Sequence, residues 1–167
     1  MAKEKGSEAE KKVLTSFEAR RLIKMEKEIK SPKSFCYPVR QNQQSCGELI
    51  PKNGPSVKLT LYAKKHGNEE NEKFSSMIIH PYLKDRLIAL DMGKHIHRYF
   101  ADGKFHQADS HLHVYTEEKG ERNVIELKAI KEFAHQGDIY GTFIDFLDYC
   151  NIINRKDIDT QGELEIE

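Results

Sequence analysis

The chain lacks long hydrophobic runs, although its 167 residues are enough to form one compact domain. No window approaches the roughly 20 consecutive apolar residues that a membrane-spanning helix needs, so we do not expect an integral membrane protein. Residues 1–12 are highly charged and contain no apolar segment of the kind found in secretory signals. We therefore expect a cytoplasmic protein.

Cysteine is scarce, and neither sign of charge is in excess. The three cysteines, Cys36, Cys46 and Cys150, are an odd set without C-x-x-C spacing, which disfavours a disulfide framework and fits a reducing cytosol. The 27 lysines and arginines equal the 27 aspartates and glutamates in number. This balance argues against a nucleic-acid binder that is basic over its whole surface, but it permits a local basic patch.

Several catalytic motifs are also missing from the sequence. It contains no P-loop, no glycine-rich dinucleotide fingerprint, no G-x-S-x-G and no H-E-x-x-H. ATPases, dehydrogenases, α/β-hydrolases and zincins are therefore disfavoured.

Two helices are expected near the ends of the domain. Thr15 and Glu18 have capping-box spacing, and the apolar residues behind them recur with helical period, which predicts a helix over residues 16–30 that ends before Pro32. Asp138 is expected to cap a second helix over residues 138–150, with Cys150 on its apolar face.

Strands fill the segment between these helices. Alternating or apolar runs predict strands over residues 57–63, 74–79, 83–91, 95–100, 111–116 and 123–128. Because the strands run together between two helices, we expect an α+β fold, an antiparallel β-sheet flanked by an N-terminal and a C-terminal helix.

The two ends of the chain are expected to lie outside the packed domain. Residues 1–14 are charged and poor in apolar groups, which predicts a disordered tail. Residues 154–167 carry an excess of acidic groups and are expected to form a mobile acidic tail. The single α+β domain is therefore expected to span residues 15–153.

Histidines are concentrated in one part of the sequence. Five of the eight lie within 19 residues, at His95, His97, His106, His111 and His113. Four of them form two H-x-H pairs, and side chains two apart on a strand point to the same face of the sheet. In the segment HLHVYT, Leu112 and Val114 are expected to face the core, which leaves His111, His113 and Tyr115 on the opposite face.

A hairpin is expected between the two H-x-H pairs. Asp102-Gly103 has the composition of a two-residue type I′ turn, which would place His97 opposite Ala108. If the pairing were unbroken, the two histidine pairs would lie on opposite faces, and one bulge in residues 106–110 would bring them to the same face. A second hairpin is expected around Gly120, which would supply a left-handed residue.

Three interpretations of the histidines remain open. His97, His111 and His113 have a spacing that suits a divalent metal such as zinc. Alternatively, the same imidazoles act as general base and general acid in RNA cleavage, with Asp91 or Asp102 orienting one of them. The third interpretation is that they are ordinary polar positions on a solvated sheet face.

Part of the sequence resembles an uncharacterised family of small bacterial and phage proteins. The resemblance runs from Leu90-Asp91 through His97 and Asp102-Gly103 to the HLHVY segment, and it extends over about residues 13–153. Ala89 stands where that family tends to have arginine. The resemblance implies a bacterial or prophage context but no particular activity.

Two functions of different class follow from these observations. The first is an interaction or regulatory module that uses the histidine-rich sheet face to bind a protein partner, or else a nucleic acid. The second is a toxin-like ribonuclease or metal-assisted phosphodiesterase that uses His97, His111 and His113 with Asp91 or Asp102. Imidazole nitrogens that converge within about 4 Å would favour chemistry or metal binding.

Overall fold

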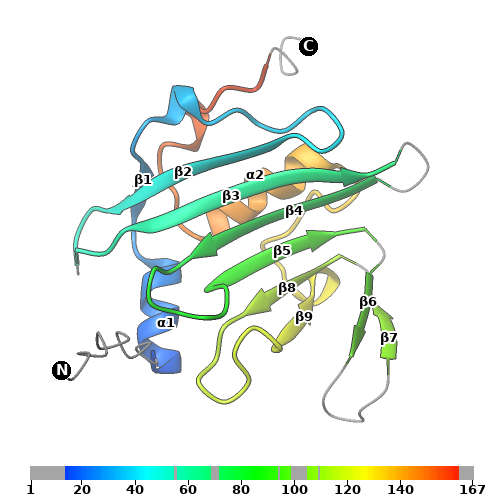
Figure 1. Ribbon diagram of the computed structural model, residues 1–167, viewed down its shortest axis with the longest axis horizontal. Helices are drawn as coiled ribbons and strands as arrows, with labels where there is room; N and C mark the ends of the chain where they lie inside the picture. Colours follow the sequence, from blue (N-terminus) through cyan, green and yellow to red (C-terminus); the bar gives the residue numbers. More distant parts are fainter. Residues whose placement is uncertain are drawn as a thin grey trace, which may run out of the picture.

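A computed structural model describes residues 14–54, 56–68, 72–93, 95–98, 105–108 and 110–161, and only the backbone of 95–98 and 105–108. These residues form a seven-stranded antiparallel sheet with one α-helix before it and one after it in the sequence (Figure 1). The predicted α+β class is confirmed. No helix of the described part is long and apolar enough to span a membrane.

The helices and strands are as follows. The α-helices are α1 (Ser16–Lys24) and α2 (Ile139–Tyr149), and the short 3-10 helices are η1 (Pro32–Ser34), η2 (Leu127–Ala129) and η3 (Arg155–Asp157). The main sheet has the order β1-β2-β3-β4-β5-β8-β9, with β1 (Lys27–Ile29), β2 (Gln44–Pro51), β3 (Leu59–Gly67), β4 (Glu72–Ile79), β5 (Ile88–Met92), β8 (His111–Val114) and β9 (Val124–Glu126). A separate two-stranded sheet pairs β6 (His95–Arg98) with β7 (Phe105–Ala108).

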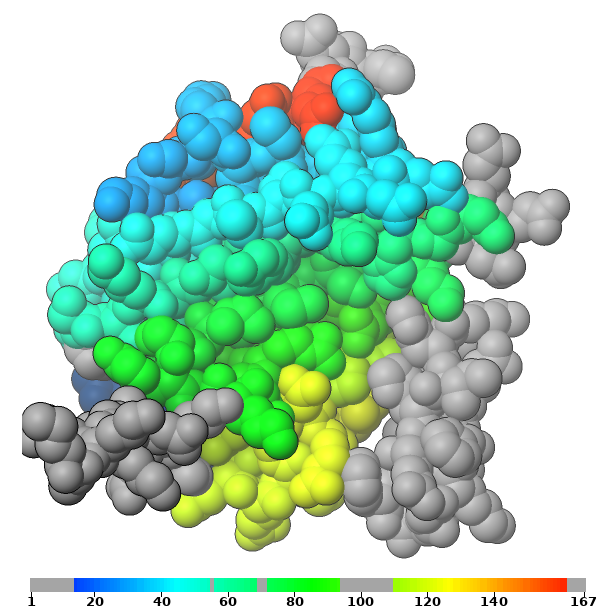
Figure 2. All heavy atoms as spheres, in the orientation of Figure 1, coloured from blue at the N-terminus to red at the C-terminus, as the bar shows by residue number. Residues whose placement is uncertain are grey.

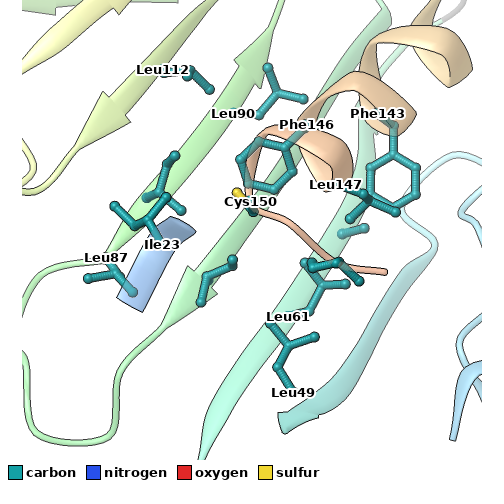
Figure 3. Packing of buried hydrophobic residues seen from close by; sticks show 14 of the residues in the cluster. Ile23, Leu49, Leu61, Leu87, Leu90, Leu112, Phe143, Phe146, Leu147 and Cys150 are labelled. Carbon is teal, nitrogen blue, oxygen red and sulfur yellow. The ribbon is translucent and has the colours of Figure 1, made fainter. Parts of the chain in front are cut away.

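One face of the main sheet is packed against α2. Alternate residues of the central strands, such as Leu61, Leu90 and Leu112, are fully buried. Phe146 of α2 and Cys150, which directly follows the helix, lie against this layer (Figure 3). Burying one such leucine or phenylalanine side chain contributes about 1.5–3 kcal/mol. Cys150 therefore lies in the core, as its place on the predicted helix indicates.

The other face of the sheet is not covered by α2. Figure 2 shows this face, where the cyan and green strands β2 to β5 run side by side and α2 lies behind the sheet. Because Leu112 points into the core, His111 and His113 lie on the open face, as predicted. Tyr115 does not, because the chain has left the strand there. Its hydroxyl donates to the carbonyl of Leu14, and its ring joins the core.

Helix α1 is shorter than the sequence predicts. It ends at Lys24, and residues 27–29 form β1 instead of two further helical turns. The side chain of Lys27 is completely buried, and its ammonium donates hydrogen bonds of 2.7–2.8 Å to the carbonyls of Leu22, Ile23 and Met25. These carbonyls lie at the helix end, where carbonyls have no intrahelical partner and a positive charge is favourable. Burial lowers the pKa of Lys27 to about 8.

The packed part of the chain extends beyond the predicted domain at both ends. Leu14 and Ile158, which lie just outside the predicted range 15–153, are buried. Asp159 anchors the C-terminal segment, since its carbonyl accepts from the N–H of Tyr37 and its own N–H donates to Phe35. The two backbone bonds and the apolar side chain of Ile158 explain why this acidic segment is held.

The first predicted hairpin is present with a different register. His97 lies opposite His106, not opposite Ala108, and the hairpin forms a separate sheet rather than continuing the main one. The register of a hairpin is set by the type and length of its turn, and the observed partner of His97 is two residues away from the predicted one. Asp102 itself lies outside the described residues. In the second hairpin, Gly120 has a φ of 58°, as predicted.

Replacing Lys27 is expected to destabilise the fold. Lys27→Met should lower the free energy of unfolding by about 2–4 kcal/mol, because it leaves buried carbonyls without a donor. Lys30→Met is the matched control, since the Lys30 side chain is 61% exposed and its ion pair with Glu48 is on the surface, and it should cost less than about 1 kcal/mol. Urea denaturation measures both, and equal effects would show that Lys27 does not hold the end of α1.

The three cysteines are expected to differ in reactivity. Cys46 is exposed, whereas burial raises the pKa of the Cys150 thiol to about 12 and a hydrogen bond to Asp159 raises the pKa of Cys36. At pH 8 the native protein should therefore react rapidly with about one equivalent of a disulfide reagent, and Cys46→Ser should remove that phase. A rapid phase that survives in Cys46→Ser would contradict this assignment.

Candidate metal centre

The sheet register brings three polar side chains into one row on the open face. Ser75 of β4 lies opposite Asp91 of β5, and Asp91 lies opposite His111 of β8. His113 follows two residues later on β8 and therefore shares this face. Asp91, His111 and His113 are all buried, although the face itself is not covered by a helix.

The ligating atoms of Asp91, His111 and His113 converge. The Nε2 atom of His113 lies 2.9 Å from Oδ2 of Asp91, and the Nε2 atoms of the two histidines are 3.1 Å apart. The third distance, from His111 Nε2 to Asp91 Oδ2, is 3.6 Å. In the described part of the chain, these three residues are the group of histidine, cysteine and acidic side chains that could hold a metal ion.

The backbone fixes the orientation of His113. Its Nδ1 atom lies 2.7 Å from the carbonyl oxygen of Glu121, and because a carbonyl only accepts, Nδ1 carries the hydrogen. The Nε2 atom on the other side of the ring faces Asp91 and His111. A carbonyl or carboxylate that holds one nitrogen of a histidine is the usual outer support of a metal ligand.

Asp91 is held in place from both sides. Its Oδ1 atom accepts a hydrogen bond of 2.8 Å from the hydroxyl of Ser75, which lies 2.9 Å from Nε2 of His66. Its Oδ2 atom is the one that faces the two histidines. The carboxylate therefore presents one oxygen to the centre while the other is bound to the neighbouring strand.

Arg86 and Glu121 border the centre. The guanidinium Nε of Arg86 donates to Oε2 of Glu121 at 3.0 Å, and Nη1 of Arg86 lies 4.0 Å from Oδ2 of Asp91. The backbone N–H of Arg86 donates to the same Glu121 oxygen at 2.8 Å. Glu121 thus positions Arg86 with its carboxylate and His113 with its carbonyl.

The charges of the centre favour an ionised carboxylate. Burial alone would raise the pKa of Asp91, but hydrogen bonds from His111, His113 and Ser75 and the charge of Arg86 outweigh it and hold this pKa well below its ordinary range. For Glu121, burial likewise acts upward, but its bonds to Arg86 lower the pKa. Both carboxylates therefore carry a negative charge at neutral pH.

The spacing of the three atoms suits a small metal ion. A tetrahedral zinc ion with bonds of about 2.0–2.2 Å holds its ligand atoms about 3.3–3.6 Å apart. The observed separations of 2.9, 3.1 and 3.6 Å are close to these values. Two imidazoles and one carboxylate are also a donor set that zinc and neighbouring transition metals accept.

Comparison with known families places the chain in one of them. The model of the family of unknown function DUF6978 matches residues 14–152, which is most of the chain and includes all three converging residues. The chain belongs to the DUF6978 family. No curated protein and no solved structure matches it.

The structure brings together three of the five residues that the sequence singles out. Asp91, His111 and His113 converge within the predicted distance of about 4 Å. His97 lies on β6 in the separate hairpin, and its side chain is outside the described part, as is Asp102. A role for either in the centre stays a prediction, and so does the bacterial or prophage origin.

The residues around the three ligands were not predicted from the sequence. Ser75, Arg86 and Glu121 come from three other segments, and only the pairing of β4 with β5 and the turn after β8 bring them here. Pairing the predicted strand 74–79 with the predicted strand 83–91 could have placed Ser75 beside Asp91. Ala89, where the resemblance suggests arginine, lies opposite His113, and Arg86 brings a guanidinium to the centre from the segment before β5.

Proposed function

We propose that this DUF6978 protein is a metal-dependent interaction module. Asp91, His111 and His113 bind one divalent transition-metal ion, zinc in the first place, and the ion binds a group supplied by a partner. The observation that carries this proposal is the convergence of three ligating atoms: Nε2 of His113 lies 2.9 Å from Oδ2 of Asp91 and 3.1 Å from Nε2 of His111, while Glu121 holds the other nitrogen of the His113 ring.

Two acceptors that face each other in a buried place require a cation between them. Without one, the lone pair of His113 and the charge of Asp91 repel each other where little water is present to screen them. A proton on Nε2 satisfies one pair of atoms, whereas a metal ion satisfies all three converging atoms at once. The position of His111 Nε2, which is within 3.6 Å of both other atoms, therefore favours a metal ion.

Three protein ligands leave room for a ligand from outside. Structural zinc sites are closed by four protein ligands, whereas sites with three keep a position for water or another group. The three ligands are buried, and among the side chains of the centre the more exposed ones are those of Arg86 and Glu121, so a partner group would approach from that side. An open coordination position of this kind supports the proposal of a protein that acts through a partner.

Metal-assisted cleavage of a phosphodiester, as in a ribonuclease, is the second candidate. It is favoured by one specific observation, the position of Arg86 beside a three-ligand set. A metal ion in such a set activates water, and a nearby guanidinium stabilises negative charge in the transition state.

Metal binding is tested by calorimetric titration of the chelator-treated protein with zinc. We expect one ion per chain, and we expect Asp91→Asn, His111→Ala and His113→Ala each to weaken binding at least tenfold, because each removes a ligand. His135→Ala is the matched control, since His135 is paired with Asp145 and is not one of the three converging residues. Asp91→Asn preserves the shape of the side chain, so we expect this variant to fold. An unchanged circular dichroism spectrum would verify that it does. Failure of the wild-type protein to bind zinc, or equal binding by Asp91→Asn, would contradict the proposal.

Turnover separates the two candidate functions. The zinc- and manganese-loaded proteins are incubated with bis(p-nitrophenyl) phosphate and with single-stranded RNA. An interaction module should show no release of product above that of His113→Ala. A rate in the wild type that is at least tenfold higher, and that chelation abolishes, would favour the phosphodiesterase.

A further inference from the structure

We propose that the external ligand of the metal ion is a phosphate-type oxyanion, held between the ion and the guanidinium of Arg86. This inference rests on the proposed metal centre and names the class of group that the centre recognises. It follows from the position of Arg86, from the net charge of the centre, and from the exposure of the side chains around the centre.

Arg86 is fixed at the edge of the ligand set. Its backbone N–H and its Nε both bind the same oxygen of Glu121, which restrains the side chain at two points. Its Nη1 atom then lies 4.0 Å from the Asp91 oxygen that faces the two histidines. A guanidinium held rigidly in this way presents its outer N–H groups without a further loss of side-chain entropy.

The charge of the centre makes anion binding dependent on the metal. Asp91 and Glu121 carry two negative charges, and Arg86 contributes one positive charge among the side chains that contact the ligands or each other. The group is therefore net negative without a metal ion and would repel an anion. A divalent ion reverses the sign for this group of three side chains, and an oxyanion then bridges the ion and the guanidinium.

A phosphate group suits this arrangement better than a carboxylate. Its oxygens are directed to the corners of a tetrahedron, so one binds the ion while two others accept the paired N–H groups of a guanidinium. The two oxygens of a carboxylate lie in one plane and cannot do both with the same geometry. Free phosphate and a terminal phosphate have the three oxygens that this arrangement uses, whereas a phosphodiester has two, one for the ion and one for an N–H of the guanidinium.

The exposure of the side chains shows where such an anion enters. The side chains of Arg86 and Glu121 are 23% and 32% exposed, whereas those of Asp91 and His111 are 11% and 0% exposed. Among these groups, the centre therefore meets solvent beside Arg86. An anion that approaches from solvent meets the guanidinium before it reaches the ion.

The test uses the full-length protein loaded with cobalt(II), whose visible absorption reports changes in the coordination of the ion. Inorganic phosphate, dimethyl phosphate and acetate are titrated separately into the loaded protein and into the metal-free protein. We expect phosphate to change the spectrum of the loaded protein and to show no calorimetric binding to the metal-free protein. Arg86→Gln should weaken phosphate binding at least tenfold, and Arg86→Lys should weaken it less.

The controls separate the loss of the anion site from the loss of the metal site. Arg86→Gln should bind cobalt as tightly as the wild type or more tightly, because a positive charge near Asp91 is removed. Arg122→Gln, which changes a neighbouring arginine bonded to Lys119, should bind both metal and phosphate normally. Stronger binding of inorganic phosphate than of dimethyl phosphate would indicate a terminal or free phosphate, and comparable binding would indicate a phosphodiester.

Two results would overturn the inference while the metal centre stands. The first is a cobalt-loaded wild type that binds phosphate no better than acetate, and the second is equal phosphate affinity in the wild type and Arg86→Gln. If the wild type bound no cobalt and no zinc, the metal centre itself would be refuted and the inference with it.

Discussion

The alternation of side chains along a strand is the constraint on which the centre depends. Leu112 must point into the core against α2, and this forces His111 and His113 together onto the opposite face. The same rule places Asp91 on that face, because Leu90 is buried beside Leu112. The apolar packing that stabilises the sheet therefore also sets the positions of the three ligands.

The sequence predicted that His111 and His113 share the open face, because this placement depends only on the alternation of side chains along one strand. The pair His111 and His113, with Leu112 between them, fixed the face without knowledge of the fold. The residues that complete the surroundings could not be predicted in that way. Ser75 reaches Asp91 through a strand pairing, and Glu121 reaches Arg86 across 35 residues, so both depend on tertiary structure.

The end of α1 also depends on tertiary structure and therefore could not be predicted from local sequence. The helical period of apolar residues continues beyond residue 24, and the local signal for the end of the helix was Pro32, which lies after the observed end at Lys24. The stop comes from Lys27, whose backbone N–H donates to Asn151 and whose side chain turns back to the helix carbonyls. A lysine in an amphipathic pattern normally indicates the solvated face, and here the tertiary structure buries it.

The order of the strands explains why the ligands lie where they do. The chain leaves the main sheet after β5, forms the β6–β7 hairpin, and returns as β8 beside β5. Asp91 is the penultimate residue of β5, before the hairpin, and His111 is the first residue of β8, after the hairpin. The N–H of Gly93 and the hydroxyl of Ser110 are 3.4 Å apart where the two ends meet. Because the ligands flank this junction, the pairing of β5 with β8, in which Asp91 lies opposite His111, sets the distance between these two ligands.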